Sequence, residues 1–209
     1  MKTISIFLLL AILLVFSSCS QNNVNGSNSS KKPKVKEKVK PIADEEYAVI
    51  ELENSEAFQP ITIELYSNLA PKMVARFKEL ANEDFYKGIT FHRVNKSVIQ
   101  AGDPNSKDNI PENDGIGSSD KPNVPAEFSD LLYDTTIVGA ARKGDDVNSQ
   151  NSQFFITLKR EKGFDKNYTI FGKVIDGMNS VRTIAGVPRD NRERPLDDVV
   201  IKSITIKKK

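Results

Sequence analysis

Short stretches in which apolar and polar residues alternate dominate the chain after about residue 44. Ile61, Ile63 and Leu65 are separated by Thr62 and Glu64, which is the period of two expected of a half-buried β-strand. Short apolar runs recur along the rest of the chain, at residues 91–94, 98–101, 136–141, 153–157, 169–174 and 199–206. Because these runs are too numerous for a helical fold, they predict a mainly β domain.

Two segments have the period of an amphipathic helix instead. Pro71 suits the first turn of the earlier segment, where the missing N–H of proline is not needed. Four apolar residues of that segment share one face, namely Val74, Phe77, Leu80 and Ala81. The later segment has an apolar face formed by Met178, Val181 and Ile184 and a candidate left-handed cap at Gly186. Many short strands and two helices predict a barrel or a sandwich with covered ends.

The first 18 residues have the layout of a secretory signal peptide. Lys2 supplies a positive start, residues 4–16 are apolar apart from Ser5, and small residues precede Cys19. The apolar run is shorter than the roughly 20 residues that cross a bilayer. The small residues before Cys19 resemble the lipobox of bacterial lipoproteins, in which the cysteine is lipidated and becomes the new N-terminus. An ordinary signal peptide with an incidental cysteine is the alternative.

Residues 19–43 are predicted to be the lipidated cysteine and a flexible tether. Asn, Ser and Lys are abundant there and large apolar residues are scarce, so the segment cannot offset the entropy cost of ordering it. Its lysines between 31 and 40 either contact anionic lipid headgroups or belong to a solvated linker. These features predict an exported protein that its lipid anchors in the bacterial cell envelope. Ser20 is compatible with the periplasmic side of the outer membrane.

Composition and charge exclude several classes of function for the remaining domain, residues 44–209. The chain has 30 Lys and Arg against 28 Asp and Glu, so nucleic acid is not an implied partner. Its single cysteine, Cys19, allows no internal disulfide. With His92 as the sole histidine, a metal site or a Cys/His dyad is not expected. The common nucleotide-binding and hydrolase motifs are also missing from the sequence, and no cofactor is implied.

Three motifs in the domain carry a family resemblance. They are Phe91-His92-Arg93-Val94, Val98-Ile99-Gln100-Ala101-Gly102-Asp103-Pro104 and Asn151-Ser152-Gln153-Phe154-Phe155-Ile156. Shorter matches follow the same order, at Ala70-Pro71, Phe85-Tyr86, Pro125-Ala126-Glu127-Phe128, Phe171-Gly172-Lys173-Val174 and Arg194-Pro195-Leu196. Together they resemble the cyclophilin family of peptidyl-prolyl isomerases over roughly residues 46–206. The resemblance implies a closed eight-stranded antiparallel β-barrel capped by two α-helices, with its substrate cleft on the outer face of the barrel.

The resemblance also implies the roles of individual residues. Arg93 would be the catalytic donor to the prolyl nitrogen, and Gln100 would hold Arg93 and the substrate backbone. Phe155, Phe164 and either Ile99 or Val98 would line the proline pocket. Ala141 and Gln153 would contact the residues just before the proline. His92 and Tyr168 complete the predicted substrate-binding residues.

Some positions depart from the family pattern and leave an alternative function open. The segment between Val94 and Gln100 is one residue short, the usual pocket phenylalanine is missing, and Tyr168 stands where many relatives carry a histidine. The favoured hypothesis is an isomerase that acts on proline-containing unfolded or flexible polypeptides as a monomer. A non-catalytic peptide-binding or chaperone module is the alternative. A purely structural envelope lipoprotein has no positive feature in its favour.

Overall fold

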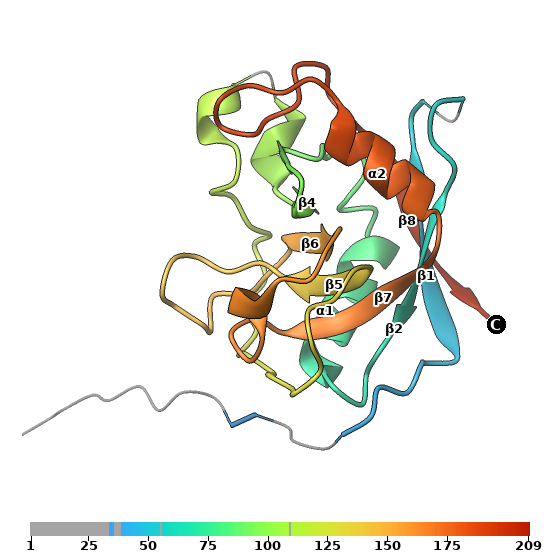
Figure 1. The fold of residues 1–209 in the computed structure, drawn as a ribbon, viewed down its shortest axis with the longest axis vertical. Helices are drawn as coiled ribbons and strands as arrows, with labels where there is room; N and C mark the ends of the chain where they lie inside the picture. The colour runs from blue at the N-terminus through green and yellow to red at the C-terminus, as the bar shows by residue number, and fades with distance from the viewer. Residues whose placement is uncertain (1–33, 36–38, 55, 109) are drawn as a thin grey trace, which may run out of the picture. The chain divides into compact units, whose positions relative to one another are not determined.

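The computed structural model describes residues 34–35, 39–54, 56–108 and 110–209 (Figure 1). The predicted signal peptide, Cys19 and most of the predicted tether lie outside the described residues. The described residues belong to one compact unit. In this part of the chain, neither helix has the length and hydropathy of a membrane-spanning segment.

Eight antiparallel strands form one curled sheet (Figure 1). They are β1 (Glu46–Leu52), β2 (Ile61–Leu65), β3 (Arg93–Val94), β4 (Val98–Ala101), β5 (Ile137–Ala140), β6 (Phe154–Thr157), β7 (Ile170–Asp176) and β8 (Ile201–Lys208). Their order in the sheet is β3-β4-β6-β5-β7-β2-β1-β8. Every strand region predicted from the apolar pattern contains one of these strands, so the mainly β class is confirmed.

The sheet remains open between its two end strands, so the predicted closure of the barrel is wrong. β3 has only two residues, and its ladder is with β4 on one side only. The residues just before it make the only link between these edges in the described part of the chain. This link is an isolated bridge between Thr90 and Val200, flanked by backbone hydrogen bonds from Phe91 N to Val199 O (3.0 Å) and from Ile201 N to Ile89 O (2.8 Å).

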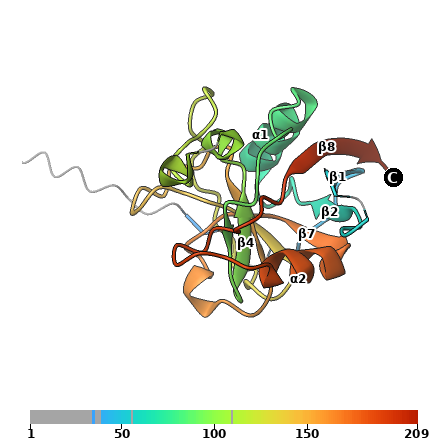
Figure 2. The same cartoon turned by 90° about the horizontal axis from the view of Figure 1, so that it is seen from above.

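Two helices cover the curled sheet, α1 (Pro71–Asn82) and α2 (Met178–Gly186). They lie at opposite ends of it (Figure 2), and both pack against the same core on its inner face. The predicted apolar faces are confirmed, because all four predicted residues of α1 are buried and so are Val181 and Ile184 of α2. The predicted left-handed cap at Gly186 is wrong. Gly186 is the last helical residue, and the left-handed position is Gly177, with φ 84°, just before α2.

The main core lies between the curled sheet and both helices. Phe77 of α1 is its centre, with ring-centroid distances of 5.4 Å to Tyr86, 5.5 Å to Phe154 and 5.2 Å to Phe171. A second, smaller apolar cluster lies on the opposite face of the sheet. Its members are Tyr66, Leu69, Val98, Tyr133, Ile137, Phe155 and Ile170, with Phe164 and Tyr168 packed against them. This second cluster forms the floor of the candidate site.

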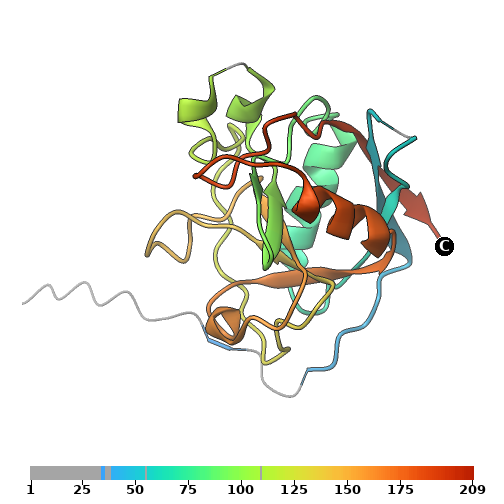
Figure 3. The same cartoon turned by 45° about the horizontal axis from the view of Figure 1, so that its top comes forward.

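Three short 3₁₀ turns occur in the long connections, at η1 (Pro104–Lys107), η2 (Pro111–Asn113) and η3 (Lys162–Phe164). The connection after α2 passes beside β3 and β4 (Figure 3). A backbone hydrogen bond from Val94 N to Glu193 O (2.7 Å) fixes this approach. The connection between α2 and β8 therefore reaches the same edge of the sheet as the motif of residues 91–94.

Candidate functional site

The strand register places residues from the separate motifs in one row. Arg93 on β3 pairs with Gln100 on β4, Gln100 pairs with Phe155 on β6, and Phe155 pairs with Gly139 on β5. Directly paired residues point to the same side of a sheet. The guanidinium, the amide and the aromatic ring therefore lie side by side on the face opposite the main core.

A cleft of about 320 Å³ opens over this row. The predicted residues that line it are His92, Arg93, Val98, Gln100, Ala141, Phe155, Phe164 and Tyr168. Gln153 lines an adjoining hollow of about 450 Å³, which shares Gln100 and Ala141 with the cleft. The structure thus brings together all the predicted site residues of the domain except Ile99.

Ile99 is not part of the cleft, which corrects its predicted place in the proline pocket. It is fully buried in the main core. Successive residues of a strand point to opposite faces, so Val98 and Gln100 face the cleft while Ile99 faces inward. Of the two alternatives for this pocket position, the structure selects Val98.

Gln153, rather than Arg93, holds the side chain of Gln100. Gln100 Nε2 donates to Gln153 Oε1 at 2.9 Å. Gln153 Nε2 in turn donates to the carbonyl oxygens of Gly115 (3.0 Å) and Gly117 (2.8 Å). Gln153 therefore joins the row of site residues to the 115–117 loop, and the predicted contact from Gln100 to Arg93 is not among the hydrogen bonds of the described residues.

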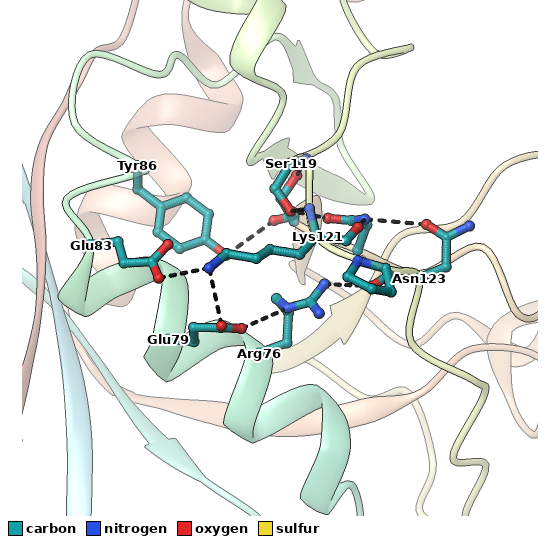
Figure 4. Close-up of polar contacts among 10 residues, drawn as sticks. Arg76, Glu79, Glu83, Tyr86, Ser119, Lys121 and Asn123 are labelled. Atoms are coloured by element: carbon teal, nitrogen blue, oxygen red, sulfur yellow. Dashed lines mark hydrogen bonds and ion pairs between the residues drawn. The ribbon is translucent and has the colours of Figure 1, made fainter.

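A polar network fixes the continuation of this loop against α1 (Figure 4). Lys121 Nζ donates to Glu79 Oε1 (3.1 Å) and Glu83 Oε1 (2.7 Å). Arg76 Nη1 donates to the carbonyl of Pro122 at 2.8 Å. Surface ion pairs of this kind contribute little to stability one by one, but together these contacts join residues 121–122, which follow the 115–117 loop, to α1.

Aromatic rings form the apolar end of the cleft. Phe155 is 4% exposed, and its ring lies 5.7 Å from that of Tyr133, 5.4 Å from Phe164 and 5.6 Å from Tyr168. The guanidinium carbon of Arg142 lies 4.7 Å from the Tyr168 ring centroid, within the range of a cation–π contact. The cleft therefore combines an apolar pocket with a basic rim.

Gly139 makes room for the Phe155 ring, and its replacement by alanine is expected to disturb the pocket. A Cβ atom at this position would lie 2.5 Å from both Phe155 Cζ and Tyr133 Oη. Because these rings are packed against further aromatic rings, we expect Gly139→Ala to lower the free energy of unfolding by about 1–3 kcal/mol. Denaturant unfolding measures this change. Gly163→Ala is the matched control, because a Cβ there would meet nothing within 4 Å; equal stabilities of the two variants would contradict the packing argument.

His92 lines the cleft as a buried neutral ring. Its side chain is 5% exposed, and neither ring nitrogen has a hydrogen-bond partner within the described residues. Burial lowers the pKa of His92 from 6.5 to about 4, and the charges of Arg93 and Arg194 act in the same direction against that of Asp103. His92 is therefore uncharged at neutral pH and supplies shape rather than charge to the cleft.

The titration of His92 is expected to have its midpoint near pH 4. Because it is the only histidine of the chain, NMR signals of the imidazole can be followed directly as pH is lowered. Between about pH 6.5 and pH 4 the unfolded chain takes up a proton that the folded protein does not. Stability is therefore lost as pH falls through this window, by up to about 3 kcal/mol from this group. A midpoint near 6.5 would contradict burial of the neutral ring.

Several residues of the site were not predicted from the sequence. They are Pro111, Asp114, Gly115, Arg142, Arg192 and Arg194. Arg194 donates from Nε to Asp114 Oδ2 at 2.6 Å, and Arg192 Nε lies 3.8 Å from Asp190 Oδ2, so carboxylates neutralise part of the basic rim. Two of them could have been found from the sequence, because Arg142 directly follows the predicted Ala141 and Arg194 opens a matched motif.

In the described part of the chain, no three His, Cys, Asp or Glu side chains converge as a metal site would require.

Comparison with known proteins agrees with this geometry. Residues 47–206 match the family model described as "Cyclophilin type peptidyl-prolyl cis-trans isomerase/CLD". The chain belongs to the cyclophilin family. Among curated cyclophilin relatives, peptidyl-prolyl cis-trans isomerase 10 of Caenorhabditis elegans is 38% identical over 148 residues, which cover 70% of this chain and 88% of that protein. Human peptidyl-prolyl cis-trans isomerase-like 1 is 37% identical over 148 residues, covering 68% and 82%.

A longer relative and a solved crystal structure also match this chain. Peptidyl-prolyl cis-trans isomerase-like 2 of Gibberella zeae is 35% identical over 154 residues, but the match spans only 25% of that protein. A crystal structure of a Cryptosporidium parvum cyclophilin type isomerase superposes with a TM-score of 0.70 at 29% identity, covering 78% of this chain and 98% of that one. The same protein was also solved in the presence of the dipeptide Ala-Pro, with a TM-score of 0.69.

Proposed function

We propose that this cyclophilin catalyses cis/trans isomerisation of Xaa-Pro peptide bonds in polypeptides that bind along the cleft. Rotation about a peptide C–N bond has a barrier of about 18–20 kcal/mol because of its partial double-bond character. A catalyst therefore needs no nucleophile, only a group that stabilises the twisted bond. The observation that carries the proposal is that Arg93 and Phe155 line the same 320 Å³ cleft, one charged donor opposite one aromatic ring.

In this proposal Arg93 acts on the twisted bond. Its guanidinium stays protonated and offers several N–H donors in a fixed fork. A donor aimed at the prolyl nitrogen favours the pyramidal form of that nitrogen, which exists in the twisted state and not in either planar ground state. Arg93 can therefore bind the transition state more tightly than the substrate. The side chain is 47% exposed and so remains within reach of a bound chain.

The rest of the cleft would hold the substrate. The apolar pocket of Val98, Phe155 and Phe164 would take the proline ring, and the adjoining hollow beside Ala141 and Gln153 would take the residues before it. Gln100 and Gln153 can bond a substrate backbone, because each amide has both donor and acceptor atoms. Tyr168 would cover the pocket from the side.

We further propose that the protein acts on exported chains from a lipid anchor on Cys19. The support is the signal peptide pattern of residues 1–18 and the small residues before Cys19. Unfolded chains hold roughly 10–30% of their Xaa-Pro bonds in the cis form, which relaxes over tens to hundreds of seconds, so folding after export can wait on this step. The mass of the N-terminal peptide of the mature protein, with or without an added lipid, tests the anchor.

The activity itself is tested with the protein purified in detergent, which keeps in solution both the unprocessed chain with its apolar residues 4–16 and the proposed lipidated form. Isomerisation of a short Xaa-Pro peptide is followed by a coupled assay with and without the protein. Acceleration over the uncatalysed rate supports the isomerase. A folded protein that binds the peptide without any acceleration would instead support the alternative of a non-catalytic peptide-binding module.

A further inference from the structure

Glu193 is held beside Arg93 by its own backbone. Its φ of 69° lies in the left-handed region, which is uncommon for a residue other than glycine. Glu193 N donates to Asp190 O at 3.1 Å, and Glu193 O accepts from Val94 N at 2.7 Å. The tight turn of residues 190–194 is thus fastened to the strand that carries Arg93.

The carboxylate of Glu193 bonds two side chains of the first motif region. Its Oε2 accepts from Arg93 Nε at 2.7 Å and from Asn95 Nδ2 at 2.8 Å. Asn95 is itself fixed, because its Oδ1 accepts from Ser97 N (2.8 Å) and Val98 N (2.9 Å). Burial opposes ionisation, but the hydrogen bonds from Asn95 and Arg93 hold the pKa of Glu193 below its ordinary value. The carboxylate is therefore charged at neutral pH.

The contact between Arg93 and Glu193 uses a single nitrogen of the guanidinium, Nε. Nε carries one N–H donor, and the two Nη nitrogens carry the other four donors of the planar group. Within the described residues, the Nε–Glu193 pair is the only hydrogen bond of the Arg93 side chain. A bond at Nε restricts the rotation of the plane and leaves the four Nη donors of this cleft-lining residue without a hydrogen-bond partner among the described residues.

We propose that Glu193 is a positioning residue that orients the Arg93 guanidinium so that it can donate a hydrogen bond to the prolyl nitrogen. This inference rests on the proposed isomerase function. An ion pair whose side chains are 47% and 37% exposed contributes little to folding stability. Its expected benefit is a faster isomerisation, because a donor that is already held in its working orientation loses no conformational freedom when the peptide bond twists. The strained φ of Glu193 is then the cost of placing its carboxylate at Nε.

Kinetics of the full-length protein test the proposal. Glu193→Ala is expected to lower kcat about 10-fold with little change in KM, since the pocket of Val98, Phe155 and Phe164 is untouched. Glu193→Gln is expected to keep most of the activity, because its amide oxygen can still accept from Arg93 Nε. Glu46→Ala is the matched control: the Glu46 side chain is also 37% exposed and pairs with Lys78 at 3.1 Å, away from the cleft. An unchanged kcat in Glu193→Ala, or an equal loss in Glu193→Gln, would overturn the proposal.

A spectroscopic measurement separates this proposal from the isomerase function. The NMR cross-peak of Arg93 Nε–Hε reports directly on the hydrogen bond to Glu193. It is expected to shift and to exchange faster with water in Glu193→Ala and to stay unchanged in Glu46→Ala. A parent protein without isomerase activity would reject the proposed function, whereas an unmoved Arg93 cross-peak in a folded Glu193→Ala protein would reject the positioning role.

Discussion

Replacing Arg93 by alanine is expected to lower kcat/KM for an Xaa-Pro peptide by about 10²–10³-fold, the usual effect of removing one donor that acts on a transition state. The reason is that Arg93 is the cationic donor in register with Gln100 and Phe155 across three adjacent strands. Its removal leaves the apolar pocket for proline in place. The coupled isomerisation assay measures the loss, and circular dichroism confirms that the variant is folded.

Two further variants make this result specific. Arg93→Lys keeps the charge but not the planar fork of donors, so it is expected to recover only a small part of the activity. Arg182→Ala is the matched control, because Arg182 is an exposed arginine of α2 whose Nη1 donates to Asn179 at 3.3 Å. Full activity of Arg93→Ala, or an equal loss in Arg182→Ala, would show that another group stabilises the twisted bond.

The largest expected effect on stability comes from Phe77→Ala. Phe77 is fully buried, and three aromatic rings lie around it at centroid distances of 5.2 to 5.5 Å. Truncation leaves a cavity that these packed rings cannot fill. We expect the free energy of unfolding to fall by about 3–5 kcal/mol, a large share of the roughly 5–15 kcal/mol that stabilises an ordinary domain. Urea denaturation at constant pH measures the change.

Phe85→Ala provides the comparison for the core prediction. Phe85 is only partly buried at the edge of the same core, with its ring 5.3 Å from that of Tyr86. Its truncation opens a site that water can reach, so we expect a cost of about 1 kcal/mol. If the two variants lost the same stability, Phe77 would not be the centre of the core.

The apolar pattern predicted most of the secondary structure, but it predicted neither the first strand nor whether the sheet closes into a barrel. β1 was not predicted because residues Ala48, Val49 and Ile50 are buried in succession, which breaks the period of two. It lies between β2 and β8 in the sheet. Barrel closure depends on hydrogen bonds between chain ends far apart in sequence, and no local pattern reports their number.

Every cleft residue within the three long motifs was predicted, and the cleft residues that were missed all lie outside those motifs. Arg93, Gln100 and Phe155 belong to motifs, so each was found. Glu193 lies 100 residues after Arg93, in a turn whose sequence carries no sign of its target. Ile99 was assigned to the pocket because a motif does not say which side of a strand a residue faces; alternation along β4 decides it.

The shape of the site determines which prolines it can reach. The cleft and the adjoining hollow share Gln100, Gly115, Ala141 and Arg142, so they form one continuous groove along the surface of the sheet. A polypeptide can enter such a groove sideways, with both of its ends remaining in solvent. In the proposed function no chain terminus has to be threaded, so a proline in the middle of a long substrate is expected to be as accessible as one near its end.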